Sequence, residues 1–259
     1  MIDIAHLTKR YGRVTALAGV SFAIRSGEVL GLIGPNGSGK TTLFECLAGV
    51  LPADEGTVHV DGEALGLRER SRAFFYMPDG IAPWPQQTVR WALRFAAGYF
   101  GGPGPAKAGH DRDHDRDQDR DHVDVTPVVA GFSRTVSDLT RVFDLEPLLD
   151  VRIGELSKGQ RKRVLLAIGL LTPAPVLLAD EPFDGLDLRQ TRDIGAALRS
   201  FASAGRTLFL SIHQIADAAR YCDRFVLLSA GRVCGEGTTR EVTDRTRTDN
   251  LEDAFLALT

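Results

Sequence analysis

The chain has 259 residues, of which 43% are hydrophobic and 25% charged, and its formal net charge is −3. This composition is ordinary for a folded protein with a sizeable core, and the length suits one large domain or a core with a subdomain. The small negative charge and the lack of a long basic stripe disfavour nucleic acid as a partner.

The first quarter of the chain is predicted to be rich in β-strands. Val20, Phe22 and Ile24 alternate with polar or small residues, and Val58 and Val60 repeat this alternation before a turn. Such a period of two is typical of half-exposed strands.

A glycine-rich loop joins a predicted buried strand at 28–33 to a predicted helix at 41–49. The loop fits G-x-x-x-x-G-K-[ST], a pattern that cradles nucleotide phosphates. It reads Gly34-Pro35-Asn36-Gly37-Ser38-Gly39-Lys40-Thr41-Thr42. Backbone N–H groups of such a loop point at the phosphates, and the helix N-terminus adds partial positive charge. We therefore expect Lys40 to reach the β- and γ-phosphates and the Thr41 hydroxyl to hold Mg²⁺.

A helical insertion is predicted at 84–156, after a short strand at 73–77. Apolar residues recur at helical spacing from Val89 and again from Val136. Between them, 101–126 is rich in Asp, Arg and His and lacks the apolar surface that would offset the entropy of ordering. We expect a solvated, disordered loop there. A weak metal site remains the alternative, on the histidines His110, His114 and His122.

Alternating strands and helices return after the insertion. Apolar runs predict strands at 176–179, 207–212 and 225–229, with a helix at 186–202. This alternation predicts an α/β core with a mostly parallel sheet covered on both faces. We assign 1–83 and 157–245 to that core and 246–259 to a helical tail.

Cysteine usage and the first residues predict a cytoplasmic protein. Cys46, Cys222 and Cys234 match no metal-binding spacing, so reduced thiols are expected. Residues 1–4 lack the basic and apolar regions of a signal peptide. No apolar stretch approaches the roughly 20 residues of a spanning helix, so another chain must supply any membrane spans.

Two further motifs carry chemistry. Asp180 and Glu181 follow the strand at 176–179, and a carboxylate at this edge of a parallel sheet can serve Mg²⁺ beside a phosphate loop. Asp180 is expected to take that role, and Glu181 to act as general base toward the attacking water. Ser157 and Gln160 form a capping box before an apolar helix.

In this order the elements resemble the nucleotide-binding subunit of ATP-binding-cassette (ABC) transporters over nearly the whole chain. The stretch Leu156-Ser157-Lys158-Gly159-Gln160 is similar to that family's L-S-G-G-Q signature, with Lys158 replacing a glycine. The matches to its other motifs are Asp180-Glu181-Pro182 for Walker B, Gly185-Leu186-Asp187 for the D-loop, His213 for the switch histidine and Tyr11 for the adenine-stacking aromatic.

The resemblance implies a P-loop NTPase core with an antiparallel β subdomain and an inserted helical subdomain. It implies that two such subunits face head to tail, so that Ser157 and Gly159 of one meet the ATP held by the other. Asp187 is expected in the same site, and His213 is expected to contact the γ-phosphate and position Glu181. The implied partners are a second ATP-binding subunit and a transmembrane permease, with the chain on the inner face of the membrane.

One departure from the family concerns the loop after 73–77, where Asp79 stands in place of the usual Gln. Aspartate is shorter and charged, so we expect Asp79 to bind Mg²⁺. The residues Thr88-Val89 and Leu93-Arg94-Phe95, the tail and Lys158 resemble ATPases of two-component exporters, which favours export over import. Two alternatives stay open: a soluble ABC ATPase without a transport role, and a degenerate binding module.

Overall fold

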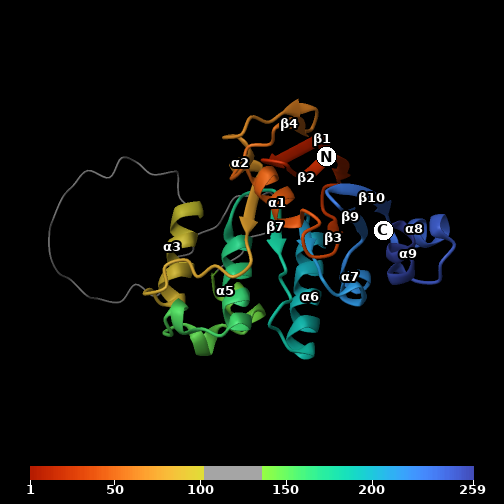
Figure 1. The fold of residues 1–259 in the computed structure, drawn as a ribbon. Helices are drawn as coiled ribbons and strands as arrows, with labels where there is room; N and C mark the ends of the chain where they lie inside the picture. Colours follow the sequence, from red (N-terminus) through yellow and green to blue (C-terminus); the bar gives the residue numbers. More distant parts are fainter. Residues whose placement is uncertain (102–135) are drawn as a thin grey trace. The chain divides into compact units, whose positions relative to one another are not determined.

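The computed structural model describes residues 1–101 and 136–259, and these divide into two compact units (Figure 1). The first unit holds 1–81 and 174–259, and the second holds 82–173. The second unit therefore reaches beyond the insertion predicted at 84–156, because the helix that follows Ser157 packs on the other helices of this unit. The loop predicted at 101–126 lies outside the described residues except for Gly101.

A six-stranded sheet forms the centre of the first unit, in the order β10-β9-β3-β8-β7-β6. Its strands are β3 (Val29–Ile33), β6 (Phe74–Met77), β7 (Val176–Asp180), β8 (Thr207–Ser211), β9 (Arg224–Ser229) and β10 (Arg232–Gly237). Neighbouring strands run parallel except β9 and β10. Every residue of β3, β7 and β8 is buried, as expected when both faces are covered. The predicted mostly parallel sheet is confirmed.

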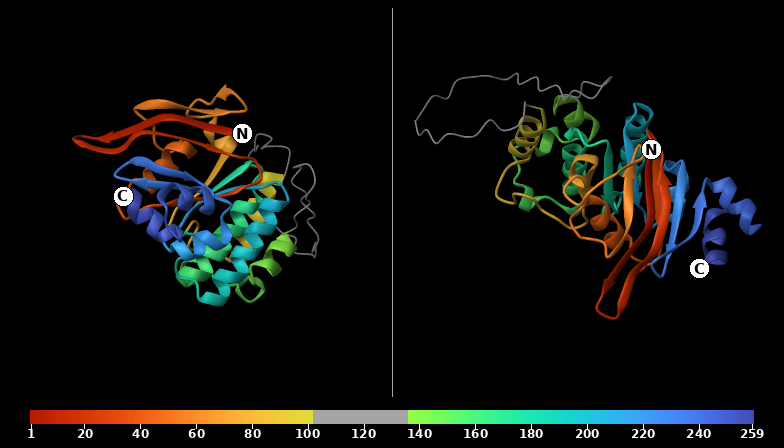
Figure 2. Two further views of the ribbon diagram at one scale, coloured as in Figure 1. Left: turned by 90° about the vertical axis from the view of Figure 1, so that its right-hand side faces the viewer. Right: turned by 90° about the horizontal axis from the view of Figure 1, so that it is seen from above.

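A second, antiparallel sheet has the order β2-β1-β4-β5. It consists of β1 (Ile2–Tyr11), β2 (Val14–Ile24), β4 (Glu55–Val60) and β5 (Glu63–Ala64). One hydrophobic cluster joins this sheet, the six-stranded sheet and helix α1 (Lys40–Ala48), with Leu7, Leu32, Phe44 and Phe209 among its buried members. Both views of Figure 2 show the red and orange strands along one side of α1. The core therefore holds β3 and α1, the two elements that flank the phosphate-loop sequence.

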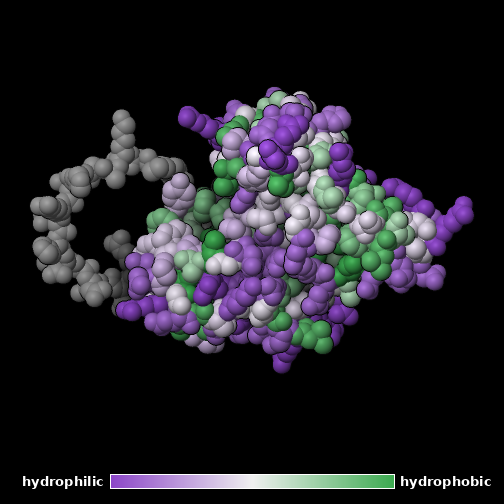
Figure 3. Space-filling view, in the orientation of Figure 1, coloured by the Kyte–Doolittle hydropathy of each residue, from purple (hydrophilic) through white to green (hydrophobic). Residues whose placement is uncertain are grey.

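Five further helices complete the described part of the first unit. They are α2 (Arg70–Ala73), α6 (Leu188–Ser203), α7 (Ile215–Tyr221), α8 (Thr239–Thr246) and α9 (Leu251–Leu258). Helix α9 lies within the tail predicted to be helical. Figure 3 shows hydrophobic and hydrophilic residues side by side over the part of this unit that carries α8 and α9, and Leu256 of α9 is exposed. Among the residues that the structure describes, no helix is both long and apolar enough to cross a membrane.

The second unit is helical in its described part. It contains α3 (Val89–Gly101), α4 (Val136–Val142), the 3₁₀ turns η1 (Glu146–Leu148) and η2 (Ile153–Glu155), and α5 (Lys158–Leu171). Ser157 accepts a hydrogen bond from the Gln160 N–H, and the Gln160 side chain accepts one from the Ser157 N–H. The predicted capping box at the start of α5 is thus confirmed.

Candidate active site

The phosphate-loop sequence lies between the carboxyl end of β3 and the first turn of α1. Gly34 has no room for a side chain, since a Cβ there would lie 2.3 Å from the Leu228 carbonyl oxygen. Gly37 and Gly39 have φ angles of 79° and 105°, which favour glycine because a Cβ disfavours this conformation. Close packing and backbone conformation together require glycine in this loop. The predicted residues Asn36 and Thr42 are exposed and half-buried, respectively.

Lys40 is buried, and its ammonium group contacts the loop that precedes it. Its Nζ donates hydrogen bonds to the carbonyl oxygens of Gly34 at 2.7 Å and Pro35 at 3.2 Å. Burial lowers the pKa of Lys40, while the carboxylates of Glu181 and Asp180 act in the opposite direction. The Ser38 hydroxyl oxygen is buried too, and no described residue offers it a hydrogen-bond partner. Two polar groups are thus available to an anion at the loop.

Asp180 joins the phosphate loop to the end of the sheet. It is the last residue of β7, and both of its carboxylate oxygens accept hydrogen bonds. The Thr41 hydroxyl donates to Oδ2 at 2.8 Å, and the Ser211 hydroxyl donates to Oδ1. Sequence patterns predicted Asp180 and Thr41 at a common site, and the structure places them in contact.

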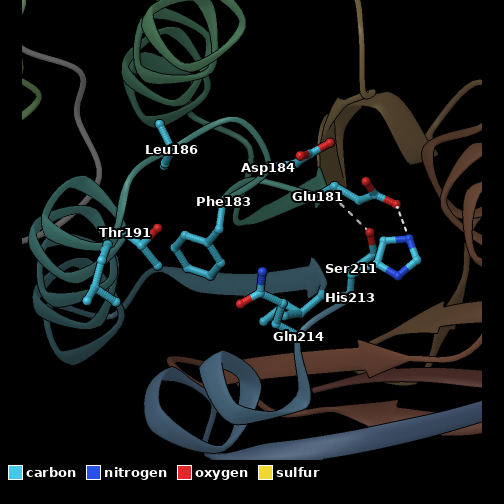
Figure 4. A pocket seen from close by; sticks show the side chains of 10 residues that line it. Glu181, Phe183, Asp184, Leu186, Thr191, Ser211, His213 and Gln214 are labelled. Atoms are coloured by element: carbon cyan, nitrogen blue, oxygen red, sulfur yellow. Dashed lines mark hydrogen bonds and ion pairs between the residues drawn. The ribbon is translucent and has the colours of Figure 1, made fainter.

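Glu181 and His213 contact each other at the same edge of the sheet (Figure 4). His213 Nε2 lies 3.0 Å from Glu181 Oε1, with exposed side-chain fractions of 44% and 22%. Glu181 has a φ of 50°, an uncommon value for a residue with a side chain that is often associated with functional sites. Both residues line a pocket of about 550 Å³, and Figure 4 shows its other labelled residues Phe183, Asp184, Leu186, Thr191, Ser211 and Gln214.

Two further carboxylates, those of Asp79 and Asp184, lie close to Glu181. Oxygens of Asp79, Glu181 and Asp184 lie within 4.8 Å of one another, an arrangement that can hold a metal ion. Sequence reasoning named Asp79 and Glu181 but missed Asp184 and Ser211. Ser211 is the last residue of β8, the strand next to β7. Its position two residues before His213 is the feature of the sequence that could have pointed to it.

The remaining predicted residues lie elsewhere. Tyr11 ends β1 and is exposed, and Lys9 Nζ lies 5.7 Å from its ring centroid. Asp187 caps α6, accepting a hydrogen bond from the Gln190 N–H at 2.8 Å. Ser157 and Gly159 belong to the second unit. The phosphate loop, Asp180, Glu181 and His213 therefore form the described site, all within the first unit.

The sequence of motifs along this site matches a known family. A model of the family described as "ABC transporter" matches residues 17–184, which is more than half of the chain. The chain belongs to the ABC transporter family. The predicted resemblance is thereby confirmed, as is the mixed α/β fold with its P-loop NTPase core.

ABC relatives of this chain are named for export. It is 33% identical over 241 residues to "Nod factor export ATP-binding protein I" of Burkholderia lata, covering 91% of this chain and 70% of the relative. The protein of the same name from Rhizobium sp. strain N33 is 34% identical over 239 residues, covering 92% and 70%. A solved ATP-binding subunit of an ABC transporter superposes with a TM-score of 0.78 at 26% identity, covering 100% of this chain and 99% of that one.

Proposed function

We propose that this ABC subunit binds and hydrolyses ATP and thereby drives a separate transmembrane permease that exports its cargo. The observation that carries the proposal is the Glu181–His213 pair, 3.0 Å apart at the edge of the sheet where Asp180 meets the phosphate loop. A carboxylate paired with a histidine in a pocket is suited to accept a proton from water.

The residues at the loop fit Mg²⁺. Thr41 and Asp180 present a hydroxyl and a carboxylate oxygen 2.8 Å apart, and Mg²⁺ prefers such hard oxygen ligands. Bound there with the nucleotide, the ion would supply positive charge to the phosphate oxygens. Asp79 is proposed as a further ligand because it stands in place of the family's usual Gln. Its carboxylate lies with those of Glu181 and Asp184, an arrangement that can itself hold a metal ion.

Side chains of this protein are proposed to bind the phosphates, accept the proton and stack on the adenine. Lys40 would leave the Gly34 and Pro35 carbonyls to pair with the β- and γ-phosphates, joined by the loop N–H groups and the Ser38 hydroxyl. Glu181 would take a proton from the attacking water, while His213 orients the Glu181 carboxylate through the 3.0 Å contact of Nε2 with Oε1. Tyr11 is proposed to stack on the adenine.

A second ATP-binding subunit is proposed to complete the site. α5 is 14 residues long, Ser157 caps its N-terminus, and Gly159 lies in its first turn. The N-terminus of a helix attracts an anion, so the start of α5 is suited to the γ-phosphate held by a partner subunit. Asp187 is proposed to face the same interface. ATP would then join the two subunits, and its hydrolysis would release them.

Export and a position on the cytoplasmic face of the membrane are proposed from the relatives, which are named export ATP-binding proteins. A permease partner should be found by co-purification of the tagged chain from detergent-solubilised membranes of its native host. Recovery of a stoichiometric polytopic membrane protein supports the transport role. Recovery from the soluble fraction without one supports the alternative of an ABC ATPase that has no transport role.

Hydrolysis is tested by steady-state phosphate release with Mg²⁺ and ATP. The wild-type chain should turn over ATP, and Glu181→Gln should lower kcat by about a hundredfold or more while ATP still binds, as expected when a general base is lost. Glu252→Gln, at an exposed carboxylate of α9, is the matched control and should keep the wild-type rate. Equal rates for all three proteins would contradict the proposal.

A further inference from the structure

Ser211 is buried where the two strands that carry the catalytic groups end side by side. It is the last residue of β8, it pairs in parallel register with Asp180 at the end of β7, and none of its surface is exposed. Its hydroxyl is therefore held by the protein alone.

That hydroxyl makes two hydrogen bonds, one as donor and one as acceptor. It donates its single hydrogen to Asp180 Oδ1 and accepts the Glu181 backbone N–H at 3.0 Å. Figure 4 shows the second contact beside the Glu181–His213 pair. Because a hydroxyl has only one proton, the two bonds fix its orientation.

The two contacts constrain both carboxylates of the site. With Oδ1 held by Ser211, Asp180 directs Oδ2 at the Thr41 hydroxyl. The hydrogen bond from the Glu181 N–H fixes the peptide group between Asp180 and Glu181. Glu181 itself has a left-handed backbone conformation, with a φ of 50°. That conformation sets the direction in which the Glu181 side chain leaves the backbone just after β7 and meets His213.

We propose that Ser211 is a positioning residue for ATP hydrolysis, whose hydroxyl fixes the orientation of Asp180 and of the Glu181 backbone together. This inference rests on the proposed ATPase function. Loss of the hydroxyl leaves the Glu181 N–H without this acceptor and removes the donor that holds Asp180 Oδ1. Because a displacement of about 1 Å can cost about a hundredfold in rate, the effect falls on kcat.

The test compares Ser211→Ala with Thr207→Val, which removes a hydroxyl at the opposite end of the same strand. Thr207 is also buried, and its Oγ1 accepts the Gly27 N–H at 3.0 Å, so both substitutions remove an acceptor from a backbone donor. Ser211→Ala should lower kcat roughly ten- to a hundredfold with little change in the KM for ATP. Thr207→Val should keep the wild-type kcat although it lowers the melting temperature.

Two further variants separate positioning from folding. Ser211→Thr keeps the hydroxyl and should restore most of the kcat. Ser211→Cys, a weaker hydrogen-bonding group of similar shape, should give an intermediate kcat, and it serves if Ser211→Ala does not fold. Binding of a fluorescent ATP analogue without Mg²⁺ should be unchanged in all folded variants.

The outcomes distinguish this inference from the proposed function. A wild-type chain whose phosphate release does not depend on Glu181 would overturn both. Glu181-dependent turnover combined with wild-type kcat in Ser211→Ala, or in Ser211→Cys where only that variant folds, would overturn the role of Ser211 alone. Equal losses of kcat in Ser211→Ala and Thr207→Val would also overturn it, because the effect would then be one of stability.

Discussion

His213 Nε2 and Glu181 Oε1 lie 3.0 Å apart, although the two residues follow different strands of the sheet, β8 and β7. The pair predicts that His213→Ala lowers kcat by about a hundredfold or more, because Glu181 loses the group that orients it. Binding of ATP should remain. The measurement is phosphate release together with nucleotide titration, and His59→Ala on β4 should match the wild-type chain. Unchanged turnover in His213→Ala would argue against any role for the pair.

Lys40→Ala should weaken ATP binding. The substitution deletes the buried cation next to the phosphate loop, and a hydrogen bond to a charged group contributes about 1.5–3 kcal/mol. We therefore expect a dissociation constant roughly 10- to 150-fold higher. Isothermal titration calorimetry measures it, with Arg68→Ala as the control because it removes an exposed cation. The role of Lys40 is refuted by equal affinities in the two variants.

Cys46 should be nearly inert to alkylation in the folded protein. Burial raises the pKa of its thiol from 9.0 to about 11. A raised thiol pKa means less thiolate, so at pH 8 the reactive fraction falls about a hundredfold. Iodoacetamide labelling followed by mass spectrometry should show slow modification that accelerates as pH approaches 11. Cys234, which is only partly buried, should react first, and faster labelling of Cys46 would contradict the prediction.

Arg224 should be important for the stability of the first unit. Its guanidinium donates to both carboxylate oxygens of the buried Glu28 and to Glu236 on β10. Removing one partner of a buried ion pair costs about 3–5 kcal/mol, because the other charge stays buried. Urea denaturation of Arg224→Met should show this loss. Arg240→Met breaks an exposed pair with Asp244 and should cost less than about 0.5 kcal/mol.

The sequence allowed the buried strands and the phosphate loop to be predicted because their signals are local. Apolar runs mark β3, β7 and β8, and glycines with a lysine mark the loop. β1 was missed because its register shifts between Ile4 and Leu7 and again before Lys9, which interrupts the alternation. Such irregularities in a strand are not visible as a period of two.

Contacts between strands limited the prediction of the site itself. Asp180 and His213 could be named from motifs, whereas Ser211 matters only because β7 and β8 pair with Asp180 opposite Ser211. Asp184 likewise joins Asp79 and Glu181 through the folding of the chain. The end of the helical insertion was misplaced because α5, although capped at Ser157, packs with α3 and α4. These relations depend on tertiary structure, which no local pattern encodes.

The most direct test of the two-subunit site is the mass of the Glu181→Gln protein in solution with saturating Mg²⁺ and ATP. Light scattering after gel filtration should give about twice the 28.1 kDa of one chain, because bound ATP joins two subunits and cannot be hydrolysed. Addition of Ser157→Arg to this variant should return it to 28.1 kDa. A monomer under saturating ATP would contradict a site shared between two copies of this chain.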